Sequence, residues 1–164
     1  MNHVQGMHMK CLEKMTQNKH LKFMQAAILE AKKAYAKDEV PVGAVAVLDD
    51  KIIARAHNLR ESKQTIHGHA EFLVMEKAAK KIGSWRLENV DVYVTLEPCA
   101  MCAGAMIQAR IRNLYYGALD PKTGAVESVI KLLDNAFNHK VSYHGRLLDQ
   151  ESSMLLKNFF KSKR

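Results

Sequence analysis

The chain has 164 residues, of which 48% are hydrophobic and 26% are charged. A chain of this length buries about 70% of the surface that its unfolded form exposes, so one domain with a sizeable core is expected, and disordered and collagen-like proteins are excluded. No window approaches the ~20 apolar residues of a membrane-spanning helix, and the first twenty residues lack the apolar core of a secretory signal. We therefore expect a cytoplasmic protein.

The formal net charge of +8 comes from 25 basic and 17 acidic residues and is concentrated at the two ends. Residues 1–24 carry +3 and residues 152–164 carry +4, which leaves +1 for the long middle of the chain. Two interpretations follow: the ends are ordinary solvated segments, or they meet an anionic partner such as nucleic acid.

The first half of the chain predicts a helix, a hairpin and a second helix. Residues 1–18 match no pattern that assigns them a role, and we set them apart from a single domain over 19–164. A helix over about 19–37 is indicated by apolar residues at helical spacing, namely Leu21, Met24, Ile28, Ala31 and Tyr35. The expected elements that follow are a strand over Val40–Leu48, a turn at Asp49-Asp50, a strand over Lys51–Ala56, a polar loop over 57–67 and a helix over 69–82. Gly83 ends this helix, because glycine readily takes the left-handed conformation that closes a helix.

The second half alternates strands and helices. The expected elements are a strand over Val90–Leu96, a helix over Pro98–Ala109, a strand over Ile111–Gly117, a loop over 120–124, a helix over Ser128–Asn135, a strand over 141–144 and a terminal helix. The terminal helix places Leu148, Leu155 and Phe159 on one face. This order of elements predicts an α/β fold in which helices cover both faces of a mixed sheet, a three-layer sandwich.

Two of the helix starts carry residues that bind metals. Three cysteines without a secretory signal argue against a disulfide framework and favour metal, redox or catalytic use; Cys11 is set aside with its terminal segment. Cys99 and Cys102 lie three apart at one helix start, so both can reach one ion, and His69 stands at the other. Two sulfur ligands and one nitrogen ligand suit zinc and leave a fourth tetrahedral position open, which is typical of catalytic sites.

Glu71 is the candidate catalytic residue. Because it lies two positions from His69, the two side chains do not share a helix face, and Glu71 is poorly placed to bind the same ion. It is instead placed to take a proton from a zinc-bound water and to pass it to a leaving group.

Each motif also has a plainer interpretation when it is taken alone. Cys99 and Cys102 fit a buried pair, or a closed structural zinc site completed by His57 or His67. The His-x-Glu segment fits an ordinary helix start with an acidic residue in its first turn.

Together, His69-Ala70-Glu71 and Pro98-Cys99-Ala100-Met101-Cys102 match the known signature of the zinc-dependent nucleobase deaminases. From about Leu21 to Phe160 the chain resembles one branch of this superfamily, the bacterial tRNA adenosine deaminases. The further segments that carry the resemblance are Glu39-Val40-Pro41-Val42-Gly43-Ala44-Val45, Asn58, Tyr93-Val94-Thr95-Leu96-Glu97, Ala103-Gly104, Asp120, Lys122-Thr123-Gly124, Asn138-His139 and Phe159-Phe160.

The resemblance implies a cytidine-deaminase-like α/β/α fold with a five-stranded mixed sheet, in a homodimer with one zinc ion per subunit. It implies hydrolysis of the wobble adenosine of a tRNA anticodon to inosine, with release of ammonia. Zinc would be bound by His69, Cys99 and Cys102. Glu71 would protonate the ring nitrogen of the flipped-out adenine and later the departing amine.

The resemblance also implies contacts between the pocket and the base. Asn58 would hydrogen-bond the adenine, while the backbone of Ala70 and the side chains of Val40 and Leu96 would help to form its pocket. For Val40, plain strand core is an equally good interpretation.

Two positions depart from the family pattern. Ile66-His67-Gly68 stands where Pro-Thr-Ala is usual in the family that the chain resembles. His67 therefore either points to solvent or caps the helix, or it crowds the pocket or competes for zinc. Glu127 stands where glycine is usual and adds a negative charge to a region expected near the RNA backbone.

Two other functions use the same motifs. A deaminase of free guanine, cytosine or a related compound needs the same zinc and glutamate, and a non-catalytic zinc module that binds RNA needs His67 to close the coordination shell. The C-terminal helix favours RNA, since aromatic and cationic groups suit nucleic acid, although core packing also explains them. These groups are Lys157, Phe159, Phe160, Lys161, Lys163 and Arg164.

Overall fold

Within residues 3–164, which the computed structural model describes, five strands form one mixed sheet in the order β2-β1-β3-β4-β5. The strands are β1 (Gly43–Leu48), β2 (Lys51–His57), β3 (Asp91–Leu96), β4 (Asn113–Ala118) and β5 (Ser142–His144). The helices are α1 (His3–Ala36), α2 (Arg60–Lys63), α3 (Ala70–Ile82), α4 (Ala100–Ala109), the short 3₁₀ helix η1 (Leu132–Asp134) and α5 (Asp149–Ser162). Strand β1 runs antiparallel to β2 and β3, whereas β3, β4 and β5 run parallel. The predicted five-stranded mixed sheet is confirmed.

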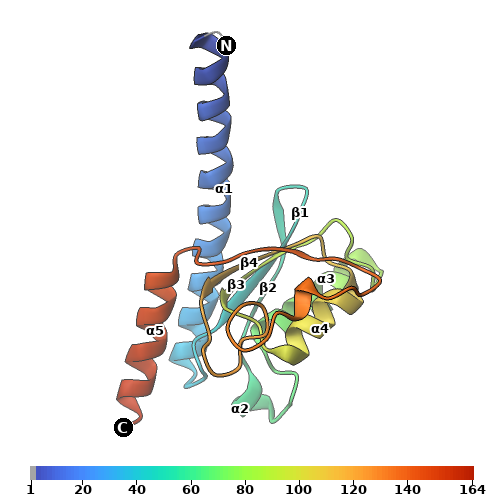
Figure 1. The fold of residues 1–164 in the computed structure, drawn as a ribbon. Helices are drawn as coiled ribbons and strands as arrows, with labels where there is room; N and C mark the ends of the chain where they lie inside the picture. Colours follow the sequence, from blue (N-terminus) through green and yellow to red (C-terminus); the bar gives the residue numbers. More distant parts are fainter. Residues whose placement is uncertain (1–2) are drawn as a thin grey trace.

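Successive residues of the strands divide the core between two helix layers, because side chains alternate between the two faces of a sheet. On β1, Ala44 and Ala46 pack in the core below α3 and α4, whereas Val45 and Val47 pack in the core below α1. Helix α5 lies beside α1 on this second face (Figure 1). The three-layer α/β/α arrangement predicted from the order of elements is therefore confirmed.

Helix α1 is longer than its amphipathic pattern predicted. The predicted start near residue 19 was wrong: the helix begins at His3 and projects well beyond the sheet (Figure 1). Residues before 19 are mostly good helix formers, so backbone hydrogen bonding continues although Met7 and Met15 stay exposed. Within residues 3–164 no helix, α1 included, is both long and apolar enough to cross a bilayer.

Strand β1 is shorter than the run Val40–Leu48 suggested, since it begins at Gly43. This glycine lies where α1 crosses the strand: a Cβ atom here would stand 2.1 Å from the carbonyl oxygen of Ala27. Its small size therefore allows helix and strand to pack closely. The predicted turn at Asp49-Asp50 is confirmed, as is the end of α3 at Gly83, whose φ is 80°.

Three other predicted segments need correction. The helix expected over 128–135 was wrong, since this stretch holds only η1; the N–H groups of Val126, Glu127 and Ser128 donate to the side chain of Glu97 instead of opening a helix. Helix α4 begins at Ala100 rather than Pro98, and its N-cap is Cys99. The loop over 57–67 contains the short helix α2.

Candidate metal centre and adjoining pocket

Three metal-ligand side chains meet where α3 and α4 begin. His69 is the N-cap of α3, Cys99 is the N-cap of α4, and Cys102 lies in the first turn of α4. The Nδ1 atom of His69 is 3.7 Å from the Sγ atom of Cys99 and 3.6 Å from that of Cys102. All three donor atoms lie within 4.8 Å of one another, so the structure brings the predicted ligands together.

The spacing of these donors fits a zinc ion. Zinc binds a histidine nitrogen at about 2.0–2.1 Å and a thiolate at about 2.3 Å, which places two tetrahedral ligands about 3.6 Å apart. The two measured N–S distances match this separation. One nitrogen and two sulfur donors are also the ligand chemistry that zinc prefers.

The surroundings of Cys99 favour a thiolate, which is the form that binds metals. A hydrogen bond from Cys102, supported by one from His69, lowers the pKa of Cys99 to about 4. The same bond raises the pKa of Cys102, and burial raises it further. Metal binding at this site therefore displaces the Cys102 proton.

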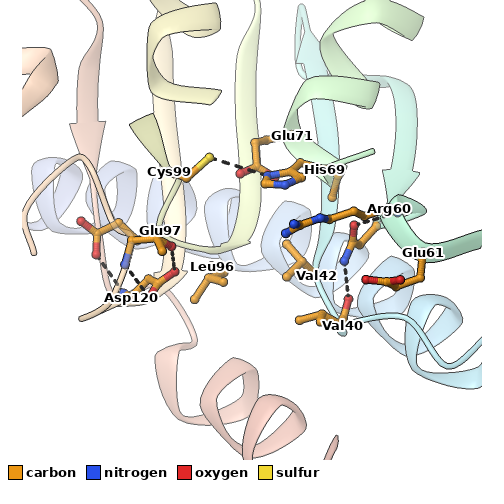
Figure 2. A pocket seen from close by; sticks show the side chains of 13 residues that line it. Val40, Val42, Arg60, Glu61, His69, Glu71, Leu96, Glu97, Cys99 and Asp120 are labelled. Atoms are coloured by element: carbon orange, nitrogen blue, oxygen red, sulfur yellow. Dashed lines mark hydrogen bonds between the residues drawn. The ribbon is translucent and has the colours of Figure 1, made fainter. Parts of the chain in front are cut away.

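Glu71 lies beside the donor cluster but is not part of it. It sits in the first turn of α3, is only 5% exposed, and lines the pocket that adjoins the three ligands (Figure 2). Burial raises its pKa above the ordinary value of a glutamate. A buried carboxyl group with a raised pKa, next to a metal-binding cluster, is suited to accept and return a proton.

The adjoining pocket has a volume of about 170 Å³. The four residues predicted to contact a substrate, Asn58, Ala70, Val40 and Leu96, all line it. The Nδ2 atom of Asn58 donates to the carbonyl oxygen of Val40 at 3.3 Å, and its Oδ1 atom accepts from the backbone N–H of Arg60 at 3.3 Å. These two contacts fix the orientation of the Asn58 amide.

Other lining residues were not assigned a role from the sequence. They are Val42, Arg60, Glu61, Glu97, Asp120 and Thr123. Asp120 and Glu97 stood within segments that carried the family resemblance, which was the available signal for them. Arg60 and Glu61 belong to α2, a short helix that the polar composition of its loop did not reveal.

The structure also shows where the two histidines considered as a fourth zinc ligand lie. His57 donates from Nδ1 to a carboxylate oxygen of Glu30 at 3.0 Å, and its Nε2 atom lies 3.0 Å from the Lys37 ammonium. His67 is exposed, with its ring 5.6 Å from that of Phe72. Neither belongs to the one metal-binding group found among the described residues, so a closed four-ligand site is not supported.

Comparison with known proteins gives a consistent result. The sequence profile described as MafB19-like deaminase matches residues 18–164. The tRNA-specific adenosine deaminase of Bacillus subtilis (strain 168) is 48% identical over 143 residues, which cover 87% of this chain and 89% of that protein.

Solved structures point the same way. One from a study of A-to-I editing by tRNA:A34 deaminases at the wobble position of transfer RNA is 46% identical, with a TM-score of 0.80, covering 82% of this chain and 99% of its own. A guanine deaminase from Bacillus subtilis is more distant, at 28% identity and a TM-score of 0.58, covering 71% of this chain and 85% of its own.

Proposed function

The chain belongs to the MafB19-like deaminase family and, within it, to the tRNA-specific adenosine deaminases, and from this premise we propose that it hydrolyses the wobble adenosine of a tRNA anticodon to inosine. Water adds at C6 of adenine, the bond from C6 to the exocyclic nitrogen breaks, and ammonia leaves. The observation that carries this proposal is a buried carboxyl group beside a zinc-type donor cluster at the wall of one pocket.

The metal centre would be formed by His69, Cys99 and Cys102, with one zinc ion per subunit. When bound, zinc supplies Lewis-acid activation of water at neutral pH. Glu71 accepts the proton of that water, delivers it to the ring nitrogen of adenine, and later protonates the departing amine. Its raised pKa suits this work, because the carboxyl group both gains and loses a proton in each turnover.

The rest of the pocket would hold the base. After its two internal contacts, the Asn58 amide keeps one donor and one acceptor position, which complements the mixed donor and acceptor edge of a purine. The apolar side chains of Val40 and Leu96 would contact the faces of the base. The backbone of Ala70 would contact its edge.

The direct test is deamination of a synthetic anticodon stem-loop. We expect inosine from an RNA with adenosine at the wobble position, detected by mass spectrometry of the digested nucleosides. Glu71→Gln should keep its zinc yet lose about 10²–10⁴-fold in rate, the usual contribution of a general acid-base group. Glu88→Gln changes an exposed carboxylate and should be unaffected. Near-normal turnover by Glu71→Gln would remove Glu71 from its assigned role.

The alternative function is deamination of a free base, which the similarity to a more distant guanine deaminase supports. The same zinc and glutamate serve both reactions, so substrate comparison decides between them. Guanine, adenine and cytosine are incubated with the enzyme beside the stem-loop, and ammonia release is measured. Turnover of a free base without turnover of the RNA would replace the proposal with this alternative.

A homodimer is supported by an apolar groove on the outer side of α3 and α4. The residues that line it include Phe72, Met75, Trp85, Leu87, Ala105 and Ala109. Trp85 is 58% exposed, although a large aromatic side chain gains much from burial. We expect a second copy to cover this groove.

Analytical ultracentrifugation tests the dimer. Trp85→Arg should shift the protein toward the monomer, whereas Met154→Arg, on the exposed side of α5 in the opposite layer, should leave the mass unchanged. An unmodified protein that sediments as a monomer contradicts this expectation.

We expect the reaction to take place in the cytoplasm. We assign it to the domain formed by residues 19–164 and assign no role to residues 1–18. The family profile begins at residue 18, and the part of α1 before it projects away from the sheet and the pocket. Cell fractionation tests the location. Deletion of residues 1–17 should leave the turnover rate unchanged.

A further inference from the structure

Glu97 is a buried carboxylate that the proposed reaction does not use. It is 1% exposed and stands two residues before the ligand Cys99. Its Oε1 atom accepts hydrogen bonds from the N–H groups of Val126, Glu127 and Ser128 at 3.2, 2.7 and 2.9 Å. Its Oε2 atom accepts from the N–H of Asp120 at 2.9 Å and from the Ser128 hydroxyl. One side chain therefore gathers five donors from a single segment.

That segment, residues 120–128, forms one wall of the pocket through Asp120 and Thr123. Its close fit around the carboxylate explains a glycine: a Cβ atom on Gly124 would stand 2.3 Å from Oε2 of Glu97. The backbone N–H of Ala125 also donates to the carbonyl oxygen of Pro98 at 2.8 Å. The wall is thus attached to the residues that lead directly into α4.

A second contact anchors the same segment from its other side. The hydroxyl of Tyr116, a buried residue of β4, donates to the carboxylate of Glu127. The side chain of Glu127 is therefore engaged with the sheet. Segment 120–128 is thus held by Tyr116 as well as by Glu97.

We propose that Glu97 is a positioning residue that holds segment 120–128 as a wall of the base pocket, and that the bond between Tyr116 and Glu127 is a second anchor of that wall. Hydrogen bonds to a buried carboxylate are strong, and losing the acceptor leaves several backbone donors without a partner. The wall contacts substrate but lies away from the transferred proton. Its release should therefore weaken substrate binding more than it slows the chemical step.

The first measurement needs no substrate. In Glu97→Gln the size of the side chain is kept, but an amide NH₂ can face the N–H of Asp120, and that contact is lost. Trypsin should then cleave after Lys122, inside the segment, about tenfold faster than in the unmodified protein. The sites are identified by mass spectrometry, and zinc content is measured on the same samples. Unchanged cleavage after Lys122 in a variant that retains its zinc overturns the proposal.

The second measurement uses the anticodon stem-loop and rests on the proposed function. Glu97→Gln should raise KM about tenfold while kcat falls less than about threefold, because the wall positions the base without handling a proton. A fall confined to kcat overturns the positioning role. If the unmodified protein does not deaminate the stem-loop, the proposed function fails, while the trypsin result still decides whether Glu97 holds the wall.

Tyr116→Phe tests the second anchor and serves if Glu97→Gln does not fold. We expect cleavage after Lys122 to rise about threefold in Tyr116→Phe. It should rise equally in Glu127→Ala and in the double variant, since either change removes the same bond. The matched control is Tyr143→Phe, which removes an exposed bond of 2.9 Å to Asp134 outside the segment and should change nothing. Cleavage of Tyr116→Phe at the rate of this control overturns the second anchor.

Discussion

Glu71 and Glu97 are both buried at the pocket, yet their surroundings shift their pKa values in opposite directions. Burial dominates at Glu71 and raises its pKa. At Glu97 burial also acts to raise the pKa, but hydrogen bonds from Ser128, Glu127 and Asp120 together outweigh it and lower the pKa. Donors to the ionised form thus separate a carboxyl group that exchanges a proton from one that stays charged and holds a segment.

This contrast predicts how stability depends on pH. The lowered folded-state pKa of Glu97 stabilises the protein above the ordinary value of 4.5, and that contribution is lost as the pH falls through the folded-state pKa. Glu97→Gln should cost about 2–4 kcal/mol at pH 7 and progressively less below about pH 4.5, measured by urea unfolding. A cost that is independent of pH contradicts the assignment.

At the scale of elements, the approach of α1 to the sheet depends on one small residue. Gly43 of β1 lies against the backbone of α1, where an added Cβ atom would stand 2.1 Å from the carbonyl oxygen of Ala27 and 2.3 Å from the amide nitrogen of Ala31. Backbone atoms within a helix cannot move aside as a flexible side chain can. The layer formed by α1 and α5 is therefore positioned at this crossing.

Gly43→Ala should destabilise the protein by about 2–3 kcal/mol or more, because the helix must move away from the strand. Thermal unfolding measures the loss. Gly6→Ala is the matched control. Gly6 lies in α1, the helix that packs against Gly43, and an added Cβ atom there meets nothing within 4 Å. It should cost nothing, because alanine favours helix over glycine. Equal stability of the two variants contradicts this role for Gly43.

At the scale of the whole molecule, the two basic ends lie at opposite ends of the fold. The free end of α1 projects from one end, whereas the last turn of α5 lies at the other, together with α2 (Figure 1). Lys163 forms an ion pair with Asp38, two residues before the pocket residue Val40. Phe159 is buried against Tyr35, while Phe160 remains half exposed. The C-terminal charge is therefore near the pocket, and the N-terminal charge is remote from it.

This arrangement predicts which lysines bind RNA. Replacing Lys157 and Lys161 by glutamine should weaken stem-loop binding and reduce the slope of log K against log salt by about 1–2, because each phosphate contact releases counterions. Replacing Lys10 and Lys14 in the same way should leave the slope unchanged. Fluorescence anisotropy over a series of salt concentrations measures both. Equal effects of the two pairs would show that net charge, rather than its position, governs binding.

The sequence by itself determined the features that depend on near neighbours. The spacing of Cys99 and Cys102, and the places of His69 and Glu71 at a helix start, follow from helix geometry. The structure brings the donor atoms of His69, Cys99 and Cys102 within 4.8 Å of one another. The order of the elements likewise predicted the three layers. Most strand and helix positions followed as well, apart from the starts of α1, β1 and α4, the missed helix α2 and the helix expected over 128–135.

Tertiary structure decided the contacts that join distant parts of the chain. Nothing in the local pattern of residues 126–128 shows that their N–H groups donate to Glu97, about thirty positions earlier, and a helix was expected to begin at Ser128. The sequence also left the role of Glu127 undetermined, whereas the structure shows that its carboxylate accepts a hydrogen bond from Tyr116. Local patterns report the preferences of neighbouring residues, whereas a buried carboxylate takes its donors from whichever backbone the fold brings to it.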